Sequence, residues 1–141
     1  VVGTGPDLKR LRAHSTNSVE FLGAVSDQEV GGLYQNAAVV LLPGTEDFGI
    51  APVEAQACGR PVVALGRGGA CETVVDGLTG ALVPQASDAA FADAIDRVIH
   101  ARLDPHGIRK HALQFSRERF HAEFHRQIEE LTLEPEKRAT S

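Results

Sequence analysis

The sequence predicts an α/β fold built on a doubly wound parallel sheet, followed by helices at its C-terminal end. Short apolar runs alternate along the chain with segments of helical period, and Gly, Pro or Asp residues bound these runs. Such alternation is typical of a parallel sheet with helices on both faces. The chain has 141 residues, of which 43% are hydrophobic, so it has the size and the apolar material for one packed domain.

Five runs are predicted to be strands, because they are short, rich in β-branched or small apolar residues, and typical of buried parallel strands. They cover residues 1–3, 19–22, 38–42, 62–65 and 81–83. In a sheet of this kind, ligands bind outside the carboxyl ends of the strands. The loops in which we expect a site are therefore those over residues 3–6, 23–27, 43–49 and 66–70.

Helix start signals occupy the segments between the strands. Ser26 and Glu29 form a capping box, in which the side chain of each residue binds the backbone amide of the other. The helix that this box opens is expected to pack through an inner face formed by Val30, Leu33, Tyr34 and Ala37. Residues 87–88 offer a second N-cap, and the Asp-Pro pair at residues 104–105 suits the cap and the first position of another helix. A final amphipathic helix is predicted over residues 116–131.

The composition excludes several classes of function. The formal net charge is −5 and the basic residues are scattered, so the sequence lacks the basic stripe that nucleic acid binding requires. No apolar run approaches the roughly 20 residues of a membrane-spanning helix. Cys58 and Cys71 lack the spacing of metal or redox sites and are interpreted as reduced packing residues, which favours a cytoplasmic protein.

The segment from residue 43 to residue 59 is the most informative part of the chain. A strand ends there, a loop with Gly and acidic residues follows, and a helix is predicted to begin near residues 48–50. Pro52 is tolerated in the first turn of that helix, and Gly59 suits the position just after its end. The free amides and the dipole of the helix start predict a diphosphate-binding site on the ligand side of the sheet.

Two acidic residues flank that helix start. Glu54 is the only charged residue between Ile50 and Cys58, so we expect packed apolar groups around a carboxylate that needs partners. A ribose diol can donate to both carboxylate oxygens, and pairing with Arg60 or a nearby amide is the structural alternative. Glu46 lies in the preceding loop, where it could bind sugar hydroxyls or stabilise positive charge at an anomeric carbon, or be an ordinary exposed acid.

Glu46 and Glu54, separated by seven residues that include Phe48-Gly49-Ile50, resemble the signature of group-1 (family 4) glycosyltransferases. Flanking segments resemble that family too, in order and at its spacing: residues 2–6, 21–27, 59–64, 68–72 and 76–80. The resemblance implies that residues 1–131 form the Rossmann-like, donor-binding C-terminal half of a GT-B fold. Residues 132–141 are then expected to be a polar, disordered tail.

The resemblance also implies roles for individual residues. Glu54 would hold the ribose, and Glu46 would be the catalytic residue beside the transferred sugar. Phosphate and sugar contacts would come from Phe48, Gly49 and Ile50, with the wall of the pocket formed by Gly68 and Gly69. The nucleobase would be bordered by Val25, Ser26 and Asp27. No metal and no cofactor other than the nucleotide-sugar substrate is expected.

Some parts of that family are expected to be absent from this chain. The donor domain normally begins one strand earlier, and the following loop carries an Arg and a Lys that neutralise the diphosphate. The acceptor-binding N-terminal domain would also be absent, so we expect the fragment alone to be inactive. The gap left beside two strand edges would be closed by local rearrangement, a partner chain or an upstream segment. A continuous five-stranded sheet within the chain would contradict this interpretation.

The predicted function is retaining transfer of a hexosyl group from a nucleotide-sugar to a glycan or lipid-linked acceptor. Glu46-Asp47-Phe48-Gly49 and the segment over residues 54–59 resemble mannosyltransferases of cell-surface polysaccharide synthesis, which indicates GDP-mannose as the donor. The full-length protein could associate peripherally with the inner membrane face. A GT-B-fold nucleotide-sugar epimerase and a non-catalytic nucleotide-binding module are the alternative functions.

Other motifs carry weaker signals. Gly3-Thr4-Gly5 begins a dinucleotide fingerprint whose third glycine would fall at Leu8, so it is interpreted as a tight turn. His121 and His125 have the spacing of a zinc-binding helix but lack the metalloprotease pattern, and we expect them to face solvent. An apolar stripe on the last helix would pack on the N-terminal domain, or in its absence drive homodimer formation.

Overall fold

In this computed structural model, the described part of the chain is residues 1–133. The elements follow the order α1 (Leu8–His14), α2 (Asp27–Asn36), β1 (Val40–Leu42), α3 (Ile50–Ala57), β2 (Val62–Leu65), α4 (Ala70–Thr73), β3 (Gly80–Val83), α5 (Asp88–Ala101), α6 (Pro105–Ala112), the 3-10 turn η1 (Leu113–Phe115) and α7 (Arg117–Leu133).

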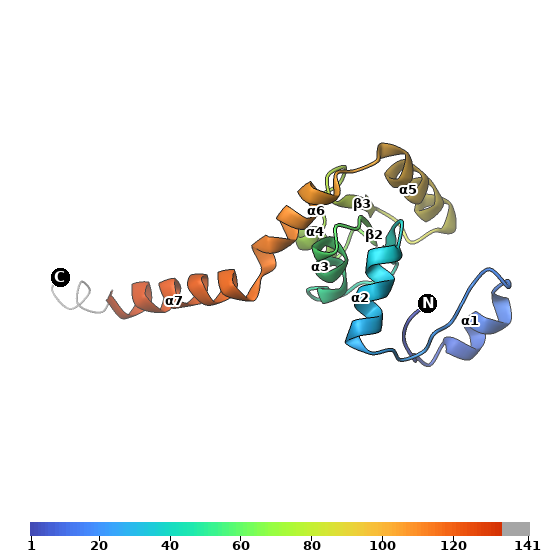
Figure 1. The fold of residues 1–141 in the computed structure, drawn as a ribbon, viewed down its shortest axis with the longest axis horizontal. Coiled ribbons are helices and arrows are strands. Elements are labelled where there is room, and N and C mark those ends of the chain that lie inside the picture. Colours follow the sequence, from blue (N-terminus) through green and yellow to red (C-terminus); the bar gives the residue numbers. More distant parts are fainter. Residues whose placement is uncertain (134–141) are drawn as a thin grey trace.

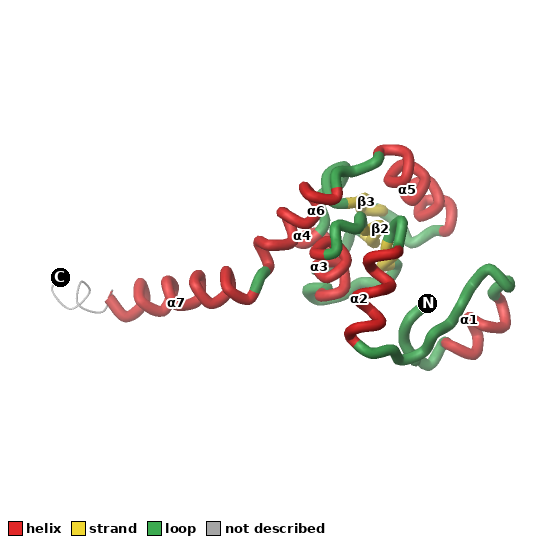
Figure 2. Tube along the Cα trace, viewed as in Figure 1, coloured by secondary structure: helices red, strands yellow, loops and turns green. Residues whose placement is uncertain are grey.

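The three strands form one parallel sheet in the order β1-β2-β3. The central strand β2 is buried at every residue, as a strand covered on both faces should be. Side chains that alternate along it enter two different cores. Figures 1 and 2 show the strands enclosed by helices, which confirms the predicted doubly wound α/β fold.

One core lies between the sheet and α3 with α4, and the other lies between the sheet and α5. The first core contains Ala55, Val62, Ala64, Ala70 and Val74. The second core contains Val63, Ala81, Val83, Ala94 and Val98. The alternation of strands and helices therefore places the loops after β1 and β2 at one edge of the sheet.

The predicted caps are formed at the helix starts. The hydroxyl of Ser26 accepts from the amide of Glu29 at 3.4 Å, and the amide of Ser26 donates to the Glu29 carboxylate at 2.8 Å. Ser87, rather than Asp88, is the N-cap of α5. Asp104 caps α6, with Pro105 at its first position. These signals were readable because each cap depends on residues within one helical turn.

Two of the five predicted strands are not formed. Residues 1–3 meet residues 19–23 through one parallel bridge, Val2 to Gly23, and a few backbone hydrogen bonds, and neither segment extends the sheet of β1, β2 and β3. Figure 2 shows the segments on either side of α1 as loops, beside the three-stranded core. Val1 and Val2 are 60% and 49% exposed, so little burial stabilises a strand there. The prediction of extended strands at these positions was wrong for this chain.

The chain leaves the core at α7, as Figure 1 shows. Ile108 in α6 is fully buried, whereas α7 projects away from the sheet. Its apolar stripe of Phe120, Phe124, Ile128 and Leu131 is exposed. The helix extends to Leu133, two residues into the predicted tail, and residues 134–141 lie outside the described part. Among the helices of residues 1–133, none has the length and apolar character needed to cross a membrane.

Gly80 permits the close pairing of β2 with β3, and its replacement generates a stability prediction. A Cβ at Gly80 would lie 1.8 Å from the carbonyl oxygen of Val62. We expect Gly80→Ala to lower the free energy of unfolding by roughly 3 kcal/mol, because this backbone has no flexible side chain to yield. Urea denaturation measures the difference.

Gly31→Ala is the matched control for that experiment. Gly31 lies within α2 and a Cβ there would meet nothing within 4 Å. The higher helix propensity of Ala should leave stability unchanged or raise it by up to about 1 kcal/mol. Equal denaturation midpoints for the two variants would contradict the close approach at Gly80.

Candidate functional site

The loops after β1 and β2 meet at the carboxyl ends of the two strands. Glu46 pairs with Gly68 in a parallel bridge, and the amide of Gly69 donates to the carbonyl of Glu46 at 2.8 Å. Because β1 and β2 are parallel neighbours, both loops emerge at the same edge of the sheet. The structure therefore brings together the predicted residues Glu46, Gly68 and Gly69.

This junction requires glycine at both positions of the second loop. A Cβ at Gly69 would lie 2.1 Å from the carbonyl oxygen of Phe48, and one at Gly68 would lie 2.3 Å from that of Glu46. Gly68 also has a φ of +58°, which L side chains rarely adopt. The backbone of the acidic loop is consequently held directly against the backbone of the Gly68–Gly69 loop.

The helix α3 begins next to this junction. Gly49, its N-cap residue, is buried in a left-handed conformation with φ 80° and ψ 79°, and provides no side chain to cap the first turn. The amides of the first turn are therefore available to a ligand, and the helix dipole favours an anion. Phe48 and Ile50 flank the start with exposed side chains, 45% and 66% accessible.

Glu54 differs from the sequence prediction in its surroundings. Its side chain is exposed rather than enclosed by apolar groups, because the buried face of α3 is formed by Pro52, Ala55 and Gln56. Arg60, the predicted structural partner, donates to the backbone carbonyl of Gln35. The expectation of a buried Glu54 was therefore wrong, and the ion pair with Arg60 is not formed.

A tyrosine that the sequence analysis assigned only to packing contacts Glu54. The phenol of Tyr34, on α2, donates to the Glu54 Oε2 atom at 3.3 Å. Burial, followed by the charge and hydrogen bond of Glu54, raises the pKa of Tyr34 to about 12, with smaller contributions from Cys58 and Glu46. Helical spacing indicated that Tyr34 faces inward, but no local pattern indicated which residue its hydroxyl meets.

A cavity of about 780 Å³ opens beside Tyr34 and Glu54. Its remaining walls are mostly apolar: Val1, Val2, Val30, Leu33, Val40, Leu41, Leu42, Pro43, Ala51, Pro52 and Val62. The cavity thus separates the N-terminal segment from β1, at the place where residues 1–3 do not join the sheet. Glu54 faces this space from α3.

The predicted nucleobase loop lies at the other end of α2. Ser26 and Asp27 begin that helix, and the hydroxyl of Ser26 is engaged in the capping box. Half-buried Val25 lines a cavity of about 440 Å³ together with Leu22, Ala24, Glu29, Gly32, Leu33 and Asn36. Eight residues of helix place Tyr34 about 12 Å along the axis from Ser26.

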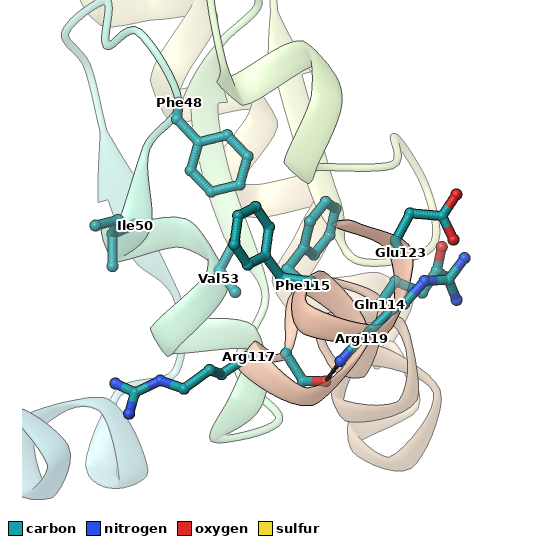
Figure 3. Close-up of a pocket in the computed structure, with 10 residues that line it drawn as sticks. Phe48, Ile50, Val53, Gln114, Phe115, Arg117, Arg119 and Glu123 are labelled. Atoms are coloured by element: carbon teal, nitrogen blue, oxygen red, sulfur yellow. Dashed lines mark hydrogen bonds between the residues drawn. The ribbon is translucent and has the colours of Figure 1, made fainter. Parts of the chain in front are cut away.

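A second cavity, of about 660 Å³, lies on the other side of α3 and is drawn in Figure 3. The rings of Phe48 and Phe115 meet edge to face at a centroid distance of 6.0 Å, and His111 packs on Phe115 at 5.6 Å. His111 Nε2 lies 3.3 Å from the carbonyl oxygen of Thr73, which ends the helix after the Gly68–Gly69 loop. The α6–η1 region therefore supports both loops of the site.

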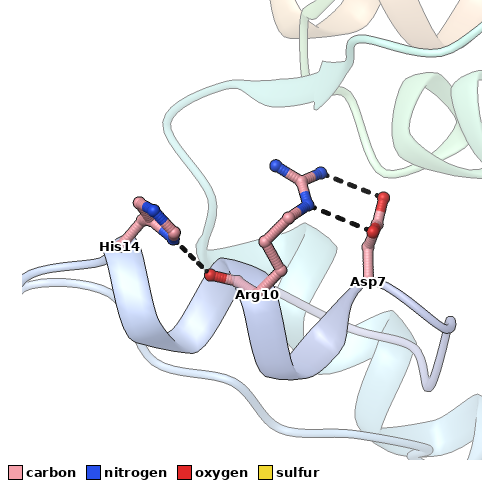
Figure 4. Close-up of polar contacts among 3 residues, drawn as sticks. All are labelled: Asp7, Arg10 and His14. Atoms are coloured by element: carbon pink, nitrogen blue, oxygen red, sulfur yellow. Dashed lines mark hydrogen bonds and ion pairs between the residues drawn. The ribbon is translucent and has the colours of Figure 1, made fainter.

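The polar contacts of α1 stabilise its start rather than build a ligand site. Arg10 donates to both oxygens of Asp7, and His14 Nδ1 lies 2.8 Å from the carbonyl oxygen of Arg10 (Figure 4). The hydrogen bonds and charge of Arg10 lower the pKa of the exposed Asp7. His121 and His125 on α7 are exposed, as predicted. Within residues 1–133, no three His, Cys, Asp or Glu side chains are grouped to hold a metal ion.

Most of the chain is similar to proteins of one family. Residues 1–115 match the family described as glycosyl transferases group 1. D-inositol 3-phosphate glycosyltransferase of Mycobacterium tuberculosis (strain H37Rv) is 40% identical over 105 residues, which cover 70% of this chain and 22% of the relative. The chain therefore corresponds to about a fifth of the length of that relative.

Two solved structures have a similar fold. Sucrose-phosphate synthase from Thermosynechococcus elongatus superposes with a TM-score of 0.80 at 27% identity, over 94% of this chain and 38% of its own. HepE of Anabaena in complex with UDP superposes with a TM-score of 0.70 at 30% identity, over 93% of this chain and 39% of its own. With the match over residues 1–115, the chain belongs to the group 1 glycosyl transferases and has the fold of the donor-binding, C-terminal half of a GT-B enzyme.

Proposed function

We propose that this chain binds a nucleoside diphosphate hexose and forms the donor half of a retaining glycosyltransferase. The observation that carries the proposal is the junction of Glu46 with the Gly68–Gly69 loop, directly before the uncapped start of α3. This junction combines free helix amides, two backbone segments in contact and a nearby carboxylate. A diphosphate bound at the helix start would present its sugar to Glu46.

The remaining parts of the donor would follow α2 and α3. The carboxylate of Glu54 would accept hydrogen bonds from the ribose diol, since it is exposed and faces a cavity. The nucleobase would border Val25, Ser26 and Asp27 at the start of α2. Phe48, Gly49 and Ile50 would contact the phosphates and sugar, with Gly68 and Gly69 as the wall behind them.

Uridine is the nucleoside that the comparisons favour. Solved structures of HepE contain UDP, or UDP and glucose, and these share 30% and 31% identity with this chain. GDP-mannose, which the sequence around Glu46 and Glu54 indicates, is the second candidate donor. Titration of the full-length protein with UDP-glucose and GDP-mannose distinguishes the two.

In the proposed transfer, the bond between the anomeric carbon and the β-phosphate oxygen breaks, and the nucleoside diphosphate leaves. An acceptor hydroxyl, on a glycan or a lipid-linked glycan, forms the new bond to that carbon, and its proton passes to the departing diphosphate. The helix amides stabilise charge on the departing diphosphate, and Glu46 stabilises positive charge at the anomeric carbon. An epimerised free donor without an acceptor product would instead support a nucleotide-sugar epimerase, and binding without either product a non-catalytic module.

The cavity between the N-terminal segment and β1 is proposed to receive a strand from outside this chain. Val1 and Val2 on one side and Leu41 on the other are 60%, 49% and 47% exposed, and the cavity walls are mostly apolar. A parallel strand inserted there would bury these side chains and pair with the N-terminal segment on one side and with β1 on the other. The acceptor-binding domain, or a second copy in its absence, would cover the exposed stripe of α7.

We place the whole protein in the cytoplasm, where the free thiols of Cys58 and Cys71 stay reduced.

Replacing Glu54 tests the ribose assignment. We expect Glu54→Ala to weaken binding of the preferred nucleoside diphosphate at least tenfold, because two hydrogen bonds to a charged acceptor are lost. Calorimetry on the full-length protein measures the dissociation constant. Glu129→Ala removes an exposed acid of α7 and is the control. Equal affinity of Glu54→Ala and wild type would remove ribose binding from the proposal.

Replacing Glu46 tests the assignment beside the sugar. Glu46→Gln keeps the size of the side chain and removes its charge, so kcat should fall by about 10²-fold while nucleoside diphosphate affinity changes little. Steady-state kinetics and calorimetry on the full-length protein provide the two values. A variant with wild-type kcat would show that Glu46 is an ordinary exposed acid.

A further inference from the structure

Tyr34 packs against the core through its ring and reaches Glu54 with its hydroxyl. The ring is half-buried and packs against the core formed by Ala55, Val62, Ala64, Ala70 and Val74. The hydroxyl reaches the wall of the cavity of about 780 Å³, where it donates to Glu54. Packing of α2 against α3 thus fixes a hydrogen-bond donor at the mouth of the proposed ribose site.

Glu54 depends on such a donor because nothing else in the described part of the chain restrains its carboxylate. Its side chain is exposed, and the ion pairs of residues 1–133 do not include it. A free glutamate samples several rotamers, and ordering it on binding costs conformational entropy. A carboxylate has about four acceptor positions, so one bond to Tyr34 leaves positions on both oxygens for a diol.

Tyr34 stays a donor over the whole physiological range. Burial and the adjacent Glu54 raise the pKa of the phenol to about 12, so the phenolate is not formed near neutral pH. Arg60 does not compete for the carboxylate, because its guanidinium donates to Gln35 on α2.

We propose that Tyr34 is a positioning residue whose hydroxyl orients the Glu54 carboxylate toward the ribose diol and so sets the preference for ribose over 2′-deoxyribose. This inference rests on the proposed function, in which Glu54 binds the ribose. The inference is supported by the hydrogen bond of 3.3 Å, the half-buried ring and the cavity that both side chains line. Tyr34 itself touches no reacting atom.

The contact can be tested in this 141-residue chain without any nucleotide, because Tyr34 is its only tyrosine and it has no tryptophan. The phenolate absorption therefore reports this residue alone. The titratable groups that raise its pKa are Glu54, Cys58 and Glu46. We expect Glu54→Gln to lower the pKa from about 12, but not to the ordinary value of about 10, since burial remains. An unchanged titration curve would show that Tyr34 and Glu54 are not in contact.

The same titration has a defined effect on stability. The folded state raises the pKa of Tyr34, so its stabilising contribution is complete below the unfolded value of about 10 and is lost as pH rises through about 12. Tyr34→Phe removes this contribution. Its free energy of unfolding should therefore depend less on pH than that of wild type between these limits, and an identical pH dependence would contradict the raised pKa.

Nucleotide discrimination tests the positioning role. The probes are UDP and 2′-deoxy-UDP, or the guanosine pair if wild type binds GDP more tightly, with calorimetry on the full-length protein. We expect wild type to prefer the ribonucleotide about tenfold, a difference of one good hydrogen bond. Tyr34→Phe, which keeps the ring, should reduce that preference several-fold. In Tyr34→Phe combined with Glu54→Ala, the loss should be no greater than in Glu54→Ala alone.

The outcomes separate this inference from the proposed function. If Tyr34 has only a structural role, Tyr34→Phe should weaken the binding of both nucleotides by the same factor and leave the ribose preference intact. That result would overturn the positioning role, while Glu54→Ala would still lose the preference. Absence of a ribose preference in wild type would overturn the role of Glu54, and the positioning role with it. Loss of preference in both single variants supports both assignments.

Discussion

The architecture of the site depends on the backbone contact between the loops that follow β1 and β2. The amide of Gly69 donates to Glu46, and the Gly69 backbone passes so close to Phe48 that a Cβ would lie 2.1 Å from its carbonyl oxygen. This contact fixes the last residues before α3, and therefore the direction in which the first amides of that helix point. The backbone of Glu46, the helix start and the glycine loop are consequently held together as one unit.

Packing by β2 on one side and by elements beyond α3 on the other holds that unit in place. The buried strand β2 contributes to two cores at once, so the loop that follows it begins at a position fixed on both faces. On the other side of α3, Phe115 packs on Phe48, and His111 contacts both Phe115 and the end of α4. Elements that are distant in the sequence thus stabilise the loops in which the proposed chemistry takes place.

The features that could be predicted from the sequence are those with local causes. The capping box of Ser26 and Glu29 and the Asp104-Pro105 start depend on neighbours within one turn, and the run over residues 62–65 is apolar because both faces of β2 are covered. Gly68 and Gly69 lie in one of the loops where the sequence predicted a site, but their close approach to the backbone of Glu46 and Phe48 was not predicted.

The features that were not predicted depend on packing between distant elements. The surroundings of Glu54 are set by what covers its side of α3, and local composition suggested burial where the structure has a cavity. The hydroxyl of Tyr34 meets a residue 20 positions away, a pairing that the angle between α2 and α3 decides. Residues 1–3 have the composition of a strand, but a single bridge to Gly23 gives them too few pairing partners to form one.

The charges around the helix start constrain how a diphosphate could be held. Glu46 and Glu54 both lie near enough to raise the pKa of Tyr34, and the chain as a whole carries a formal charge of −5. A helix N-terminus contributes only about half a positive charge, which does not balance a diphosphate beside two carboxylates. Tight binding therefore requires cationic side chains at the same edge of the sheet, in addition to the amides of α3, and the loop after β2 carries the exposed Arg67 there.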